Sequence, residues 1–302
     1  AMRVLAPGGV LCSKQAGAWK KSVKPRPTNI DEWTHYLYDA SGNPVSHDEV
    51  VAPPGRLQWT AGPSYTRSHE HTPSIFAMVA AGGRIFYISD EAPRASIRAT
   101  PQWTLIAQDA FNGVELWQRP LSDWFPHIVG WTTASVELER RLVAIGDRVY
   151  VTLGLHAPVS VLDAATGKTL SELENTAGTE EIICHQGTLL LSTRTVTPEK
   201  ISQKELWKQL VTQDNSPAFN RDTAGDVVQR LKSAEAGGDE AILAFDTSTG
   251  HLLWKKDGAD VAKLKTATLS ASGDRVFYQA KGDVVCLDLK SGKNLWTASA
   301  PT

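Results

Sequence analysis

The sequence predicts an all-β fold in which a four-stranded unit is repeated four times. Four segments share one pattern: an alternating apolar strand, an aspartate, a glycine four residues later and a second short strand. Three of the four also carry a tryptophan four residues after the glycine. Such regularly recurring turn signals between apolar runs predict a series of β-hairpins. The segments are Leu105 to Arg119, Val159 to Leu173, Ile242 to Lys256 and Val284 to Ala298.

The aspartate and the glycine of each segment are explained by the turn that joins its two strands. An aspartate carboxylate can accept backbone N–H bonds inside a tight turn, and a glycine adopts positive φ without strain. The turn residues are Asp109 and Gly113, Asp163 and Gly167, Asp246 and Gly250, and Asp288 and Gly292.

The tryptophans have a different role, because a ring of this size is suited to wedging between neighbouring sheets. Trp117, Trp254 and Trp296 stand at this position in the first, third and fourth repeats. The second repeat has Ser171 there, so we expect it to lack its wedge.

A second pair of strands is predicted before each hairpin. Gly250 and Gly292 set a period of about 42 residues, the size of one propeller blade. The sequence therefore predicts a β-propeller with four recognisable four-stranded blades, forming either a small ring or part of a larger ring of up to eight blades. The preceding strand pairs are Ala77 to Ser89, Arg141 to Gly154, Glu180 to Thr193 and Ala267 to Ala280.

Two further segments define the domain organisation. Residues 195–239 break the β pattern, and the near-helical spacing of Ile201, Trp207 and Leu210 predicts a helical insertion. The Pro-rich stretch Lys24 to Pro27 is typical of an extended linker. We therefore expect an N-terminal remnant and linker at 1–27 and a propeller domain at 28–302. Within that domain, Arg56 to Pro63 predicts a lone strand that completes a blade.

Composition excludes several classes of partner. A formal net charge of -2 gives no long-range field that would gather nucleic acid. The sequence contains no 18-residue apolar run, so we expect no membrane insertion and no signal or transmembrane segment. Cys12, Cys184 and Cys286 lie far apart and match no metal or redox spacing, which favours buried free thiols over a disulfide framework.

The densest group of polar residues is Arg67, His69 and His71, which project to one side if this segment is extended. The two histidines could ligate a metal ion with Asp90 or Glu91 as a third ligand. The trio could equally bind an anion such as a sugar acid or a phosphate. The third interpretation is a polar loop over the propeller mouth whose histidines are hydrogen-bonded.

Aromatic residues mark two further candidate ligand-binding segments. Trp33 and His35, beside a carboxylate and a tyrosine, have the composition of a carbohydrate site, but the same residues suit a segment that packs onto the propeller, which we favour. His127 and Trp131 lie in a short insertion of the first repeat, where they would form either a binding surface or a buried cluster.

Glu180 and Glu181 are adjacent carboxylates in a predicted strand. Neighbouring strand residues point to opposite faces, so we do not expect these two to act together as a general acid and base.

The repeated motif, an apolar strand followed by D-x-x-[TSN]-G-x-x-L-W, resembles the PQQ-repeat propellers. This quinoprotein-like family holds both quinoprotein dehydrogenases and non-enzymatic, BamB-like members. The resemblance covers about Phe76 to Ser299 and implies the fold; it does not imply the cofactor, because the repeated residues are turn formers and wedges. The adjacent cysteines of many quinoprotein dehydrogenases are absent and no calcium site can be placed. We therefore predict no cofactor, with PQQ or a metal ion as the alternative.

The first residues resemble a different family. Met2 to Lys14 is similar to the part of class I SAM-dependent methyltransferases in which a Pro-Gly-Gly turn leads into a late strand. The resemblance implies the remnant of such a domain, without methyltransferase activity. A plain strand opened by a turn is the alternative.

Taken together, these features predict a non-catalytic ligand- or protein-binding and scaffolding module of a larger bacterial protein. A protein or a carbohydrate-like ligand is the expected partner. The alternative is a quinone- or metal-dependent oxidoreductase acting on a sugar or an alcohol. PQQ-repeat relatives are mostly exported, so a periplasmic or exported location is expected. A true methyltransferase neighbour would need cytoplasmic SAM and would favour the opposite location.

Overall fold

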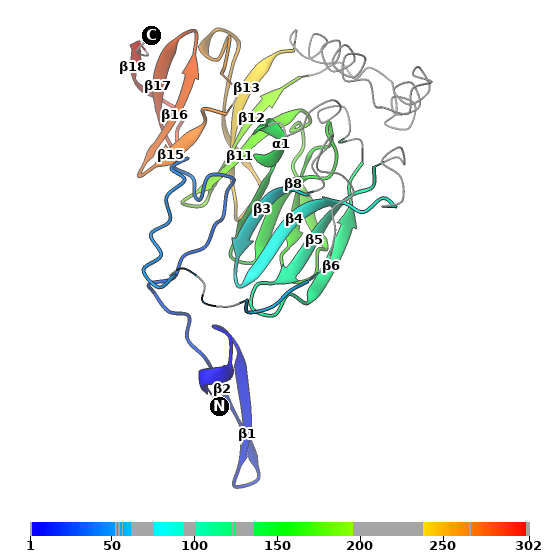
Figure 1. Cartoon of the computed structure of the whole chain (residues 1–302). Helices are drawn as coiled ribbons and strands as arrows, with labels where there is room; N and C mark the ends of the chain where they lie inside the picture. The colour runs from blue at the N-terminus through cyan, green and yellow to red at the C-terminus, as the bar shows by residue number, and fades with distance from the viewer. Residues whose placement is uncertain are drawn as a thin grey trace.

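The computed structural model describes residues 2–51, 53, 55, 57–61, 75–93, 101–122, 124, 136–195, 238–265 and 267–299. These residues form an all-β fold with four antiparallel sheets of four strands each, and a separate two-stranded hairpin (Figure 1). In every four-stranded sheet the strands follow one another in chain order, so each sheet is a simple meander. The predicted all-β, propeller-type fold with four recognisable four-stranded blades is confirmed.

Each blade combines one predicted strand pair with the hairpin that follows it. The first blade consists of β3 (Ile75–Ala81), β4 (Arg84–Asp90), β5 (Trp103–Asp109) and β6 (Glu115–Pro120). The second consists of β7 (Leu142–Ile145), β8 (Arg148–Thr152), β9 (Val159–Asp163) and β10 (Thr169–Glu172). The third consists of β11 (Thr179–His185), β12 (Thr188–Arg194), β13 (Glu240–Asp246) and β14 (Leu252–Asp257). The fourth consists of β15 (Ser270–Ser272), β16 (Arg275–Ala280), β17 (Asp283–Asp288) and β18 (Asn294–Ser299).

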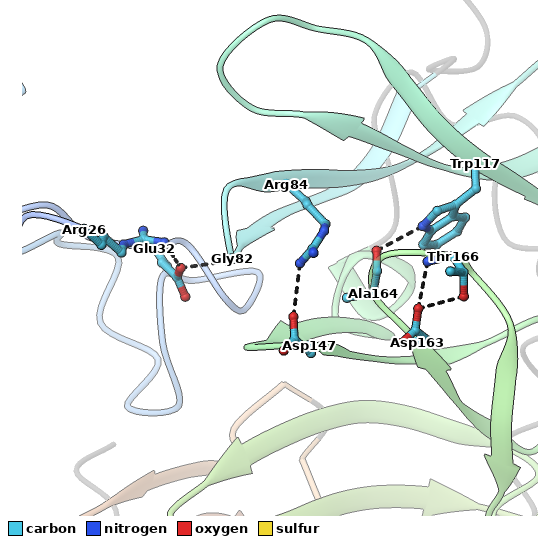
Figure 2. A network of polar contacts seen from close by, with 9 residues as sticks. All are labelled: Arg26, Glu32, Gly82, Arg84, Trp117, Asp147, Asp163, Ala164 and Thr166. Atoms are coloured by element: carbon cyan, nitrogen blue, oxygen red, sulfur yellow. Dashed lines mark hydrogen bonds and ion pairs between the residues drawn. The ribbon is translucent and has the colours of Figure 1, made fainter. Parts of the chain in front are cut away.

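The four blade turns have the geometry that the sequence predicts. In the second blade the Asp163 carboxylate accepts bonds from the N–H of Thr166 at 2.8 Å and from its hydroxyl at 2.7 Å (Figure 2). Gly167 has a φ of +68°, and its N–H donates to the Asp163 carbonyl at 2.8 Å. The same backbone bond closes the turns at Gly113, Gly250 and Gly292. Each strand pair is therefore joined by chemistry encoded within five residues.

The first strand of each blade is its inner strand. β3 lies beside β7, β7 beside β11, and β11 beside β15, while β6, β10, β14 and β18 form the opposite edges of their sheets. A buried apolar cluster fills each of the three spaces between neighbouring blades. The three clusters together form one layered core, so each blade buries its apolar side chains against the next blade.

The remaining elements are few. At the N-terminus the 3₁₀ turn η1 (Met2–Val4) precedes the hairpin β1 (Val10–Gln15) and β2 (Ala18–Val23), which lies apart from the blades (Figure 1). The short helix α1 (Val136–Glu139) precedes β7, and the 3₁₀ turn η3 (Gly258–Asp260) follows β14. The predicted helical insertion at 195–239 lies almost wholly outside the described residues. Among the described residues, no helix has the length and apolarity that crossing a membrane requires.

Two local expectations are corrected. Residues 57–61 form no strand, although the sequence suggested one; instead the Trp59 indole N–H donates to the carbonyl of Ala110 at 3.0 Å. Cys184 and Cys286 are buried free thiols as expected, but Cys12 is exposed, because both strands of the hairpin that carries it are largely exposed.

Candidate functional site

The candidate site lies along the inner strands, where a segment from the N-terminal part of the chain covers all four blades. We call this segment, residues 31–48, the strap. It crosses the inner strands between β3 and β15 (Figure 1). The Trp33 carbonyl accepts the N–H of Ala80 in β3 at 2.6 Å, and the Thr34 carbonyl accepts that of Ala144 in β7 at 3.0 Å. The strap therefore satisfies backbone donors on the edges of the first two blades.

The contacts continue across the third and fourth blades. His35 Nε2 accepts the N–H of Cys184 in β11 at 3.0 Å, and the Ala40 carbonyl accepts the N–H of Ala271 in β15 at 2.8 Å. An uncovered sheet edge presents unpaired N–H groups, which are costly when buried. On every blade the strap accepts such an N–H group and so avoids the free-energy cost of leaving it unpaired. This explains why the irregular segment packs against the sheets.

His35 is the most deeply buried polar residue of the strap, with an exposed fraction of 3%. Because Nε2 accepts a backbone N–H, the neutral ring carries its proton on Nδ1, which donates to the Thr34 hydroxyl at 2.7 Å. Loss of solvation lowers the pKa of His35 from 6.5 to about 4. The packing interpretation of this segment describes His35 better than a carbohydrate site does.

Trp33 is half-exposed at the edge of the strap. Its indole N–H donates to the Tyr36 carbonyl at 3.0 Å, and its ring meets Tyr38 edge-to-face at 5.6 Å between centroids. The Trp33 ring therefore contributes to packing within the strap itself.

A polar cluster fastens one end of the strap. The Asp31 carboxylate accepts the hydroxyls of Tyr38 at 2.8 Å and Ser46 at 2.9 Å, together with the backbone N–H of His47. These bonds hold the pKa of Asp31 below its usual value. The carboxylate therefore closes the strap into a loop.

A buried ion pair lies beneath the strap. Arg140, just after α1, pairs with Glu181 of β11, and its guanidinium stacks over the Tyr36 ring at 5.3 Å from the centroid. Glu181 Oε2 also accepts the N–H of Leu269, which precedes β15, at 3.1 Å. Burial raises the pKa of Glu181, while Arg140 opposes that shift. The pair connects the strap with three blades.

Glu180 belongs to a separate network on the other side of β11. Its carboxylate accepts Arg194 Nε at 3.1 Å, and Arg194 also pairs with Glu240 at 3.0 Å. Glu180 and Glu181 therefore pair with different arginines, in keeping with neighbouring strand residues that point to opposite faces.

The other predicted site residues are only partly described. Asp90 is buried at the end of β4, and its carboxylate accepts the N–H of Ala92 at 3.1 Å and of Gln102 at 2.9 Å, so it organises a loop. Glu91 is exposed beside it. Arg67, His69, His71, His127 and Trp131 lie outside the described residues. Within the described part, no group of three or more His, Cys, Asp or Glu side chains is arranged to hold a metal ion.

Comparison with known proteins supports the repeat assignment. Residues 155–302 match the family model described as "Outer membrane protein assembly factor BamB". The match begins in the second blade and continues through the third and fourth. The chain therefore carries BamB-like, PQQ-type repeats in this region. The search of curated proteins found no match.

Solved structures with a similar arrangement include enzymes and a BamB protein. A europium-containing methanol dehydrogenase has 11% identity and a TM-score of 0.48 over 89% of this chain and 49% of its own. A quinohemoprotein alcohol dehydrogenase from Comamonas testosteroni has 11% identity and a TM-score of 0.47 over 90% and 41%. BamB from Moraxella catarrhalis has 13% identity and a TM-score of 0.35 over 79% and 63%. This chain spans about half the length of the methanol dehydrogenase.

Proposed function

We propose that this chain is a non-catalytic binding and scaffolding module of a larger bacterial protein, with a polypeptide as its partner. The strap is the observation that carries the proposal. The inner edges of propeller blades face the central channel. Here the chain itself occupies those edges, with His35 buried against β11. A partner would therefore bind on the outer surface and between blades. The BamB-like repeats support a scaffolding role, since that family is described as an assembly factor.

The described residues at the inner strands do not fit a quinone and metal centre. A calcium site needs several free oxygen ligands, whereas both oxygens of Glu181 are already engaged by Arg140 and by the N–H of Leu269. Oδ2 of Asp31 likewise already accepts three donors of the strap. The alternative oxidoreductase would instead have to use His69 and His71, which lie outside the described residues.

The test is a comparison of the full chain with a His69→Ala, His71→Ala double variant. Both are incubated with zinc, calcium and PQQ, dialysed, and analysed for bound metal and quinone, and then assayed for dye-linked oxidation of alcohols and sugars. We expect no stoichiometric metal or quinone on either protein and no oxidation above the heat-denatured control. Stoichiometric binding that the double variant loses, together with turnover, would instead favour the oxidoreductase.

The proposal extends to the domain organisation and the location. We propose that 28–302 is the binding domain and that 1–27 is a separate N-terminal element, consistent with a hairpin that lies apart from the blades (Figure 1). Whether that element derives from a methyltransferase-like domain stays a prediction from its sequence. A periplasmic or exported location is proposed from the BamB-like repeats.

A further inference from the structure

A tryptophan joins neighbouring blades by packing on the turn of the next blade, at a site that we call the seat. Between the first and second blades, the Trp117 indole N–H donates to the Ala164 carbonyl at 3.0 Å (Figure 2). Its ring covers Gly167 so closely that a Cβ atom there would lie 2.6 Å from it. Gly167 is the turn glycine of the second blade, and Ala164 directly follows the turn aspartate. The seat thus consists of a turn glycine and one backbone carbonyl.

The same seat recurs elsewhere in the chain. Between the third and fourth blades, the Trp254 indole N–H donates to the Leu289 carbonyl at 2.9 Å, and its ring covers Gly292. On the first blade, Trp59 makes the equivalent bond to the Ala110 carbonyl and covers the turn glycine there. Three seats are therefore filled by an indole in one geometry, which makes them internal references for the fourth.

Among the described residues, no tryptophan fills the seat between the second and third blades. Ser171 pairs with Val161 in the sheet register, as Trp117 pairs with Ala107, so Ser171 stands at the wedge position. The turn glycine it should cover is Gly250, where the nearest atom to an added Cβ is a Leu173 methyl at 3.8 Å. A cleft of about 350 Å³ opens at this position, and it is lined by both Ser171 and Gly250.

The walls of this cleft are suited to a ring. Tyr150, Val161, Leu189 and Phe245 supply its apolar lining, and polar residues such as Arg148, Glu172 and Thr249 line the rest. Apolar surface combined with polar groups that fix the orientation of a ligand is typical of a binding pocket. Since a ring fills each of the three reference seats, we propose that this cleft binds a planar aromatic side chain presented by a partner polypeptide.

Arg148 determines which ring is preferred. Its guanidinium donates to the Thr247 carbonyl at 2.7 Å. Thr247 directly follows the turn aspartate of the third blade, so its carbonyl corresponds to the one that accepts the indole N–H in the filled seats. Because Arg148 already makes that bond, an indole N–H would be buried without a partner, which is costly. The cleft therefore favours the phenyl ring of phenylalanine or the phenol of tyrosine over tryptophan.

The shape of the groove favours a polypeptide over a free small molecule. A second cavity of about 910 Å³ shares Leu173, Phe245 and Gly250 with the cleft and continues to Leu252 and Lys255. Leu252 at its rim is half-exposed, with an exposed fraction of 50%. The groove is thus longer than one ring, as a flanking chain requires. This assignment rests on the proposed function, because it names the partner chemistry of the binding module.

The test uses fluorescence anisotropy with labelled heptapeptides that have the sequence of residues 113–119 of this chain. One peptide keeps its tryptophan, and the others carry phenylalanine, tyrosine or leucine in its place. The full chain is compared with Ser171→Trp, which fills the seat, and with Ser171→Ala, which leaves it open. We expect the phenylalanine and tyrosine peptides to bind the full chain and S171A equally. Binding should fall by about tenfold or more for the leucine peptide and for S171W.

An Arg148→Ala variant provides a readout that does not depend on filling the cleft. It frees the Thr247 carbonyl, so the preference should move from the phenylalanine peptide toward the tryptophan peptide. Unchanged binding to S171W, or no binding of any aromatic peptide to the full chain, would overturn the site. N-acetyl-phenylalanine amide binding as tightly as the peptide would overturn the polypeptide assignment. None of these results alters the metal and quinone analysis, so failure of the site is distinguishable from failure of the proposed function.

Discussion

The backbone N–H of Cys184 donates to the imidazole of His35, which lies 149 residues earlier in the chain. This bond places the strap on the third blade and fixes the protonation state of the ring. A proton added to Nε2 would face the Cys184 N–H and remove the bond. The neutral form of His35 is therefore required by the fold, and stability should depend on pH in a predictable direction.

We predict that stability falls as the pH is lowered from about 6.5 to about 4. The folded-state pKa of His35, about 4, lies below the unfolded value of 6.5, so the unfolded chain binds the proton first. The His35 contribution is fully present above pH 6.5 and declines by about 1.4 kcal/mol per pH unit, to a loss of about 3 kcal/mol. Urea unfolding at several pH values measures it. His35→Asn should be less stable at pH 7 but lack this part of the slope; an identical slope in both proteins would contradict the prediction.

Removal of a buried tryptophan between two blades should lower the free energy of unfolding far more than removal of an exposed tryptophan. Trp117→Ala empties a buried seat and leaves the Ala164 carbonyl without its donor, so we expect a loss of about 3 to 5 kcal/mol in the free energy of unfolding. Trp296, with an exposed fraction of 41%, is the matched control, and Trp296→Ala should cost less than about 1 kcal/mol. Chemical denaturation compares the two. Equal losses would show that the wedge is not what joins the blades.

The empty seat predicts a stabilising substitution. Ser171→Phe supplies a ring at the wedge position without an N–H that would need the Thr247 carbonyl, and burial of an aromatic side chain in an existing cleft should raise the free energy of unfolding by about 1 to 2 kcal/mol. Thermal unfolding without any peptide measures the effect. Ser291→Phe, in an exposed turn, is the control and should give no gain. A destabilised S171F protein would mean that the cleft is too narrow for an aromatic ring.

The buried ion pair should be sensitive to the loss of one partner. Glu181→Gln leaves the guanidinium of Arg140 buried without its counter-charge, which typically costs about 3 to 5 kcal/mol. The pair of Arg84 with the largely exposed Asp147, at 3.3 Å, serves as the comparison (Figure 2). Asp147→Asn should cost less than about 1 kcal/mol. If urea unfolding gave similar values for both variants, the Arg140–Glu181 pair would not be needed to connect the strap with the blades.

Thiol reactivity should distinguish the three cysteines. Cys12 is exposed, whereas burial raises the pKa of Cys184 to about 12 and also raises that of Cys286. A thiol-specific chromogenic reagent should therefore modify one cysteine in the native chain and all three after denaturation. Cys12→Ser should abolish the native reaction. Rapid labelling of a second thiol in the native protein would contradict the burial of the third and fourth blades.

The sequence by itself was enough to predict the blades. Each turn is encoded by an aspartate and a glycine within five residues, and the strands on either side alternate in a pattern that fixes their pairing. The absence of a wedge at Ser171 is also visible in the sequence, because the repeats can be aligned with one another. These features are local or repeated in the sequence, so predicting them does not require knowing which distant residues are in contact.

The tertiary structure alone decided what surrounds these elements. The sequence offered Trp33 and His35 as either a ligand site or a packing segment, and only the contacts of the strap with all four inner strands distinguish the two. Likewise, nothing in the repeat pattern indicates that Arg148 takes the carbonyl beside the empty seat, since its partner Thr247 belongs to another blade. Such pairings depend on how the blades stack, and the relevant side chains are separated by up to 149 residues. Local residue chemistry determined the blades, whereas packing between them determined the strap and the open seat.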